Sequence, residues 1–161
     1  MARKGPAKTR QVLPDKLHNS TIVTKIVNNI MKDGKKGPAQ KQVYSALDLL
    51  KKEFPKEDDV LITLEQSLEN IKPKIEVRPR RIGGAVYQVP TPVRGNRQNS
   101  LAIRWLVTAA RARSNSQHHS FGEKLAAELI AALNNEGAAV SKRTEVERMA
   151  EANKAFAHLR W

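Results

Sequence analysis

Between two stretches of helical pattern the chain reads KIEVRPRRIGGAVYQV, residues 74–89. Ile75 and Val77 alternate with charged residues before Gly83 and Gly84, and a second alternation ends at Val89. A period of two that is interrupted by glycines is typical of two strands joined by a turn. Because an isolated ribbon is only marginally stable, we expect a β-ribbon over residues 74–90 that packs on helices or on a partner.

The expected end of this ribbon is strongly basic. The sequence predicts a tip formed by Arg78, Arg80 and Arg81, where Pro79 stiffens the backbone. Pro90 and Pro92 are expected to end the ribbon. The ribbon therefore predicts a projecting surface of positive charge.

Six other segments carry apolar residues at helical spacing. Before the ribbon, helices are predicted from Ser20 to Gly34, from about Pro38 to Phe54, and from the acidic group Glu57, Asp58 and Asp59 to Pro73. After it, helices are predicted from Asn99 or Ser100 to about Arg113, from a capping box of Ser120 and Glu123 to Gly137, and near a second box of Thr144 and Glu147. The expected fold is mainly α, a single bundle of about six helices with one projecting β-hairpin between the third and fourth helices.

The net charge of +13 is unevenly distributed along the chain. Residues 1–14 hold four basic residues and no acid, and residues 71–113 hold ten basic residues against the single acid Glu76. Such segregation points to a polyanionic partner, and arginine, which forms eight of the ten central bases, suits the binding of phosphate. A solvated basic face is the alternative. We expect residues 1–14 to be an extended basic RNA-binding arm and residues 15–161 to form one helical domain.

Composition argues against several classes of protein. The chain has no cysteine, which excludes disulfides, thiolate metal sites and cysteine nucleophiles. Its apolar runs are too short for a membrane span, and its first residues form no secretory h-region. We find no glycine-rich phosphate loop and no metal-ligand spacing, and the adjacent pair His118 and His119 would face different ways on a helix. We therefore expect a cytoplasmic binding protein with no enzymatic activity, metal or cofactor.

The predicted fourth helix combines an apolar surface with a line of arginines. Arg97, Arg104 and Arg111 recur every seven residues, close to two helical turns, so their side chains lie almost on one line. The other faces are mostly apolar, as in a buried helix. Because an unpaired arginine cannot be buried, this line must meet either phosphates or carboxylates of the third or fifth helix. Both alternatives remain open.

Basic residues also stand at three predicted helix starts. They are Lys35 and Lys36 at the second helix, Arg94 and Arg97 at the fourth, and Lys142 and Arg143 at the sixth. A cation at this end of a helix opposes the helix dipole, whereas a phosphate is bound by the free N–H groups and the basic side chains together. Three such starts favour phosphate binding.

Two features that the sequence lacks indicate which kind of nucleic acid it binds. Aromatic residues make up 4% of the sequence, too few for a protein that stacks a series of unpaired bases. No helix offers the pattern of a DNA-recognition helix next to a turn. We expect recognition of the shape and backbone of structured RNA. A nucleoid-type DNA-binding protein and an RNA-modifying enzyme are the competing hypotheses.

Several stretches of the sequence resemble one known family. They are the ribbon over residues 75–90, MKDGKK at residues 31–36, VYSAL at residues 43–47, AIRW at residues 102–105 and MAEANKAFAH at residues 149–158. Together, and in order over nearly the whole chain, they resemble ribosomal protein seven of the bacterial-type small subunit.

This resemblance implies a structural constituent of the small ribosomal subunit that binds the 3′ domain of its ribosomal RNA and nucleates assembly of the head. The hairpin would line the path of exit-site transfer RNA and messenger RNA, beside ribosomal proteins nine, eleven, thirteen and nineteen, with no homo-oligomer. The expected ribosomal RNA contacts are Arg3, Lys4, Lys8, Arg10, Lys35, Lys36, Arg94, Arg97, Arg104, Arg111, Arg113, Lys142 and Arg143. The expected exit-site contacts are Arg78, Arg80 and Arg81, with Gly83 and Gly84 shaping the turn.

Overall fold

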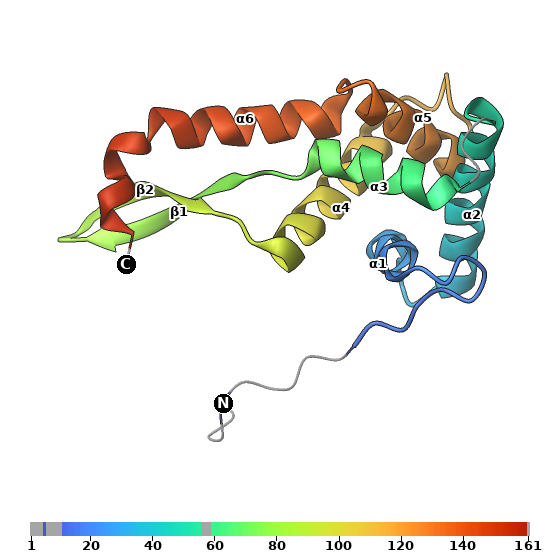
Figure 1. Cartoon of the computed structure of the whole chain (residues 1–161), viewed down its shortest axis with the longest axis horizontal. Helices are drawn as coiled ribbons and strands as arrows, with labels where there is room; N and C mark the ends of the chain where they lie inside the picture. The colour runs from blue at the N-terminus through green and yellow to red at the C-terminus, as the bar shows by residue number, and fades with distance from the viewer. Residues whose placement is uncertain (1–4, 6–10, 56–58, 161) are drawn as a thin grey trace.

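The computed structural model describes residue 5, residues 11–55 and residues 59–160. Its elements are α1 (Thr21–Ile30), α2 (Lys36–Glu53), α3 (Val60–Ile71), β1 (Ile75–Ile82), β2 (Ala85–Pro92), α4 (Gly95–Ala112), α5 (Phe121–Leu133), α6 (Ala138–Ala152) and the 3₁₀ helix η1 (Lys154–Leu159). The expected fold class is confirmed: the described chain is mainly helical, with one antiparallel hairpin between α3 and α4 (Figure 1). None of the described helices is long and apolar enough to cross a bilayer.

Helix α4 lies at the centre of the core. Leu101, Ala102, Ile103, Leu106 and Ala110 on this helix are buried, and it packs against α1, α3, α5 and α6. Burying a leucine or isoleucine side chain contributes about 1.5–3 kcal/mol, so these contacts fix α4 firmly within the bundle. The prediction of a helix apolar on most of its faces is confirmed.

The hairpin is longer than the sequence indicated. Strand β1 continues through Pro79, which pairs in register with Gln88, and β2 continues to Pro92, which pairs with Ile75. The prediction that Pro79 lies at the tip was therefore wrong. Proline is accepted here because each strand of a two-stranded ribbon is an edge strand, where a residue can turn its nitrogen away from the ladder. Gly83 and Gly84 form the turn with φ of 57° and 90°, as a tight two-residue hairpin turn requires.

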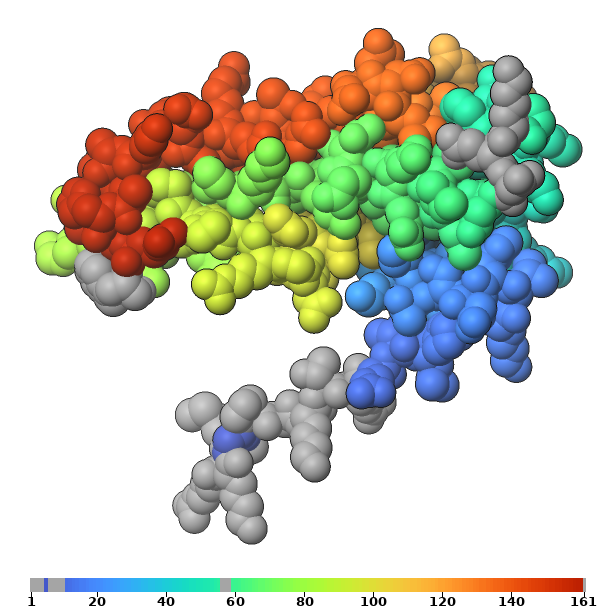
Figure 2. All heavy atoms as spheres, viewed as in Figure 1, coloured from blue at the N-terminus to red at the C-terminus, as the bar shows by residue number. Residues whose placement is uncertain are grey.

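The hairpin packs on the carboxyl-terminal helices, which is one of the two kinds of support, helices or a partner, expected for it. Helix α6 contacts both strands and η1 folds back over β2, an arrangement visible in Figure 1 and, as packed atoms, in Figure 2. The rings of Tyr87 and Phe156 lie 5.3 Å apart at an angle of 56°, and Val89 is fully buried. Only the far end of the ribbon is left to project.

Several helix boundaries differ from those predicted. Helix α1 ends at Ile30 rather than at Gly34, and α4 begins at Gly95 rather than at Asn99 or Ser100. Asp59 is the N-cap of α3, where its carboxylate accepts a hydrogen bond from Leu61 N at 2.9 Å; the other two acids predicted there, Glu57 and Asp58, lie outside the described residues.

The two predicted capping boxes have opposite outcomes. Ser120 caps α5 by accepting from Glu123 N at 3.2 Å, and the Glu123 carboxylate accepts from Ser120 Oγ at 2.9 Å and from His119 N at 2.9 Å. The Thr144 box is wrong, because Thr144 lies inside α6 and its hydroxyl donates to Val140 O. Gly137 does not close α5, which ends at Leu133, but is instead the N-cap of α6.

Candidate nucleic-acid interface

The arginine line of α4 is exposed along one side of a buried helix. Arg104 is exposed and makes no hydrogen bond or ion pair with any described residue. Arg111 donates from Nη2 to Ile30 O at 3.1 Å and to Asn29 O at 3.4 Å, carbonyls at the end of α1. Such contacts hold a guanidinium in place without neutralising it, because a carbonyl group carries no net charge. Neither residue meets a carboxylate of α3 or α5.

Arg97 at the start of this line has a carboxylate partner in the ribbon. The Glu76 carboxylate is buried and pairs with Arg97 Nη2 at 3.2 Å and with Arg78 through both its Nε and Nη2 atoms. One negative charge therefore faces two guanidinium groups, whose side chains remain 58% and 49% exposed for Arg78 and Arg97. Glu76 fixes the base of the hairpin to the first turn of α4 and leaves an excess of positive charge there.

Two of the three predicted basic helix starts are present in the structure. Lys35 and Lys36 are the N-cap and first residue of α2, and Arg94 is the N-cap of α4, with Arg97 in its first turn. Both first turns lack an acidic residue. The N–H groups at these ends and the exposed cations beside them form the kind of surface that binds phosphate.

The third predicted basic start is wrong. Lys142 and Arg143 lie within α6, because that helix begins at Ala138. Lys142 pairs with Glu145 at 2.7 Å, and Arg143 lies 3.8 Å from Glu147 and donates to Asn70 O at the end of α3. Arg143 thus joins α6 to α3, and both residues have partners within the protein.

Arg113 is held by a buried carboxylate. Its Nε atom pairs with Glu128 Oε2 at 2.7 Å, and Glu128, on α5, is 1% exposed. The other Glu128 oxygen accepts from Ala139 N at 2.9 Å, at the start of α6. Arg113 therefore forms an ion pair with the fifth helix, an alternative that was considered for Arg97, Arg104 and Arg111 but not for Arg113. Sequence reasoning missed Glu128 because a glutamate within an apolar stripe gives no sign of its partner.

The ribbon residues lie at or near its free end. Arg81, Gly83 and Gly84 are exposed, and Arg80 is half-buried. Arg78 lies farther back, opposite Val89 in the register. The predicted arm residues Arg3, Lys4, Lys8 and Arg10 lie outside the described residues.

The chain is anchored where the arm meets the helices. Tyr44 Oη donates to the two oxygens of the buried Asp15 carboxylate at 2.8 and 2.9 Å, and Leu17 N and His18 N donate to the same group. Burial favours the neutral form of Asp15, but these hydrogen bonds outweigh it and hold the pKa of Asp15 below its ordinary value. Burial and the bond to Asp15 raise the pKa of Tyr44.

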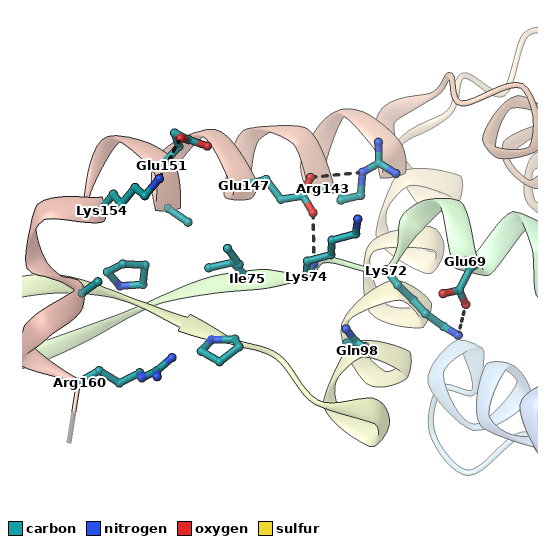
Figure 3. Close-up of a pocket in the computed structure, with 14 residues that line it drawn as sticks. Glu69, Lys72, Lys74, Ile75, Gln98, Arg143, Glu147, Glu151, Lys154 and Arg160 are labelled. Atoms are coloured by element: carbon teal, nitrogen blue, oxygen red, sulfur yellow. Dashed lines mark hydrogen bonds and ion pairs between the residues drawn. The ribbon is translucent and has the colours of Figure 1, made fainter.

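An open groove of about 860 Å³ lies between α6, η1 and the base of the hairpin (Figure 3). Glu147 lines this groove, accepts a hydrogen bond from Lys74 N at 3.2 Å and faces Arg143 on its own helix. Glu69, which also lines it, pairs with Lys72 at 2.6 Å. The groove thus mixes both signs of charge over apolar residues such as Ile75. Across the part of the chain that the structure describes, no cluster of three or more potential metal ligands is present.

Comparison with known proteins decides the family. The family model described as "Ribosomal protein S7p/S5e" matches residues 2–154. The chain belongs to this family. It is 52% identical over 161 residues to "Small ribosomal subunit protein uS7" of Caldicellulosiruptor bescii and 53% identical to the protein of the same name from Clostridium kluyveri, and it covers 100% of each chain.

Family membership confirms the resemblance that the ribbon and the four shorter stretches indicated. A protein of the S7 family is a ribosomal protein, so this chain is a component of a ribonucleoprotein that carries out translation, and its place is the cytoplasmic ribosome. The relative from Nitratidesulfovibrio vulgaris is 52% identical, again over the full length of both chains. The expectation of a family of structural proteins rather than enzymes agrees with this membership.

Proposed function

We propose that this chain is a structural constituent of the small ribosomal subunit that binds the 3′ domain of small-subunit ribosomal RNA. In this role it nucleates assembly of the head of the particle and lines the path of exit-site transfer RNA and messenger RNA with its hairpin. Its protein neighbours are ribosomal proteins nine, eleven, thirteen and nineteen. It acts by binding rather than by catalysis, and as a single copy.

One observation supports RNA binding most directly: Lys35, Lys36, Arg94 and Arg104 are exposed and have no carboxylate partner among the described residues. Cations that no internal acid neutralises repel one another, and a phosphodiester backbone removes this repulsion while releasing its own counterions. Arg97 and Arg111 extend the same surface, because each keeps an exposed guanidinium. The basic residues of the arm, residues 1–14, add a second contact in this proposal.

The proposed contacts are unequal in strength. Arg113, Lys142 and Arg143 have carboxylate partners within the protein, so each offers RNA less uncompensated charge than Arg104 does. We rank these three below the exposed residues of α4 and of the start of α2.

The RNA preference is tested by measuring the affinity of the full chain for the isolated 3′ domain, for another domain of the same ribosomal RNA, and for duplex DNA of equal length. The proposal predicts the tightest binding to the 3′ domain. It also predicts a loss of about 10³–10⁵ in affinity between roughly 50 and 200 mM salt if about 6–10 phosphates are contacted. Equal affinity for the three nucleic acids would reject the proposal and favour a general binder of polyanions.

The hairpin assignment is tested separately in assembled particles. Arg81→Gln removes an exposed charge near the ribbon end and should leave incorporation into the small subunit unchanged, while exit-site transfer RNA dissociates faster. Transfer RNA retention equal to that of the unaltered particle would reject the exit-site role and leave the RNA-binding role standing.

A further inference from the structure

A small hollow lies beside the basic surface, at the junction of four helices. It has a volume of about 310 Å³ and is bounded by the end of α1, the starts of α2 and α5, and the end of α4. Its apolar wall includes Ile30, Ala39 and Phe121, and its rim carries Lys32, Lys35 and Arg111. It is distinct from the groove between the hairpin and α6, which none of these residues lines.

The rim of this hollow is positively charged and lacks a carboxylate. The side chains of Lys32 and Lys35 are exposed and make no hydrogen bond or ion pair with the described residues. Asp33, the acid of the same turn, does not line the hollow. Arg111 is held by the two carbonyl groups at the end of α1, which fixes its guanidinium at the edge while leaving its charge uncompensated.

The wall of the hollow is apolar and includes one aromatic ring. Phe121, the first residue of α5, packs on the core yet remains partly exposed. Ala39 leaves room beside it because its side chain is a single methyl group. Gln42 is fixed in position, since its Oε1 accepts from Gly122 N at 2.7 Å. The hollow therefore offers a preformed apolar surface rather than one that must open.

We propose that this hollow binds one unpaired nucleotide of the RNA, with its base against Phe121 and its phosphate at Lys32, Lys35 and Arg111. A phosphate alone would need no apolar wall, and an apolar peptide would need no rim with three cations. A nucleotide matches both features, because it has an apolar base and a charged phosphate. Unpaired bases are bound in proteins by stacking on aromatic rings or on arginine planes, and both groups line this hollow. The inference rests on the proposed function and adds one specific base contact to the binding of the RNA backbone.

The first test uses nuclear magnetic resonance on the full chain, with nucleoside 5′-monophosphates and ribose 5-phosphate as probes. The two kinds of probe carry the same phosphate, so they differ only in the base. The proposal predicts that the monophosphates shift the resonances of Phe121 and Ala39 and bind more tightly than ribose 5-phosphate. Equal shifts from both probes at millimolar concentration, or no shift at Phe121, would overturn it.

The second test uses the 3′-domain RNA and a matched pair of variants. Phe121→Leu keeps an apolar side chain but removes the ring, and Phe54→Leu makes the same change at another partly buried phenylalanine that packs on the core and does not line the hollow. Base stacking on an aromatic ring contributes about tenfold in affinity, so Phe121→Leu should weaken RNA binding about tenfold and Phe54→Leu should not.

The two tests separate failure of this inference from failure of the proposed function. If the unaltered chain binds the 3′ domain and Phe121→Leu binds it equally well, the nucleotide hollow is rejected and the ribosomal RNA role stands. If the 3′ domain does not bind while the monophosphates still shift Phe121, the hollow is a nucleotide site and the proposed RNA target is rejected.

Discussion

Asp15 is one residue whose role follows from its contacts. Its buried carboxylate accepts hydrogen bonds from Tyr44 Oη, Leu17 N and His18 N, and so it ties the segment before α1 to α2. Its pKa lies below the ordinary value of 3.8, because these donors stabilise the charged form more than burial destabilises it. A depressed folded-state pKa means that the ionised group stabilises the protein above the unfolded pKa and that this contribution is lost as the pH falls through the folded pKa.

We therefore predict that Asp15→Asn lowers the free energy of unfolding by about 1.5–3 kcal/mol at neutral pH. The difference from the unaltered chain should begin to shrink as the pH falls below the ordinary pKa of 3.8, and it should vanish below the lower folded-state pKa, where the native carboxyl also becomes neutral. Urea unfolding at several pH values measures both the loss of stability at neutral pH and its decrease in acid. Asp48→Asn, at an exposed position of α2, is the control and should change stability by less than about 0.5 kcal/mol. A loss for Asp15→Asn that persists unchanged in acid would contradict this role of the charge.

Arg113 and Arg104 are both arginines of the basic central block, yet the structure gives them different tasks. Arg113 neutralises Glu128, which is 1% exposed, whereas Arg104 has no partner among the described residues. We predict that Arg113→Gln lowers the free energy of unfolding by about 3 kcal/mol, because it leaves a buried charge unpaired. Arg104→Gln should change it by less than about 0.5 kcal/mol.

Thermal and urea unfolding of these two variants provides the measurement, and RNA affinity is recorded beside it. The expected pattern is a crossed one, in which Arg113→Gln mainly loses stability and Arg104→Gln mainly loses RNA affinity. The reverse pattern would show that Arg113, rather than Arg104, faces the RNA.

At the scale of elements, the sequence predicted which helices and strands exist better than where they end. Periodicity located the six α-helices and the hairpin of the described residues, because it arises from the residues of each segment. The missed ends depend on residues far away in the chain: Glu128 accepts from Ala139 N at the start of α6, and Arg111 donates to Ile30 O at the end of α1. Capping residues can be recognised only among close neighbours in the sequence, so the start of α6 was predicted near Thr144 rather than at Ala138.

Helix η1 packs on the hairpin, and we expect this contact to limit the motion of the two strands. Phe156→Ala removes the ring that packs on Tyr87, a contact of a kind that contributes about 0.5–1.5 kcal/mol beyond burial. We predict that amide hydrogen exchange in β1 and β2 speeds up by about tenfold, while α4 stays protected. Val86→Ala changes a residue of β2 that is 62% exposed; it is the control and should leave exchange unchanged. Unaltered exchange in Phe156→Ala would mean that α6 alone supports the ribbon.

At the scale of the whole molecule, the charge pattern of the sequence predicted that a basic surface exists. It did not predict which residues form that surface. The excess of cations in residues 71–113 is present on the surface, because the one acid of this segment, the buried Glu76, pairs with two arginines and can neutralise only one of them. The sequence could not show that Arg113 and Arg143 turn toward internal partners, because Glu128 and the carbonyl group of Asn70 lie on other helices. Nor could it show that Lys32, Lys35 and Arg111 surround one hollow, which arises only when four helices meet.

The central claim, that exposed cations of the α4 surface are neutralised by RNA phosphates, is tested by the salt dependence of 3′-domain RNA binding. The double variant Arg94→Gln and Arg104→Gln removes two exposed charges from this surface, and the double variant Lys51→Gln and Arg148→Gln removes two exposed charges elsewhere. Each phosphate contact contributes about 0.7–0.9 to the slope of log affinity against log salt concentration. The slope should become shallower by about 1.5 for the first variant and stay unchanged for the second. Equal slopes for the first variant and the unaltered chain would contradict the claim.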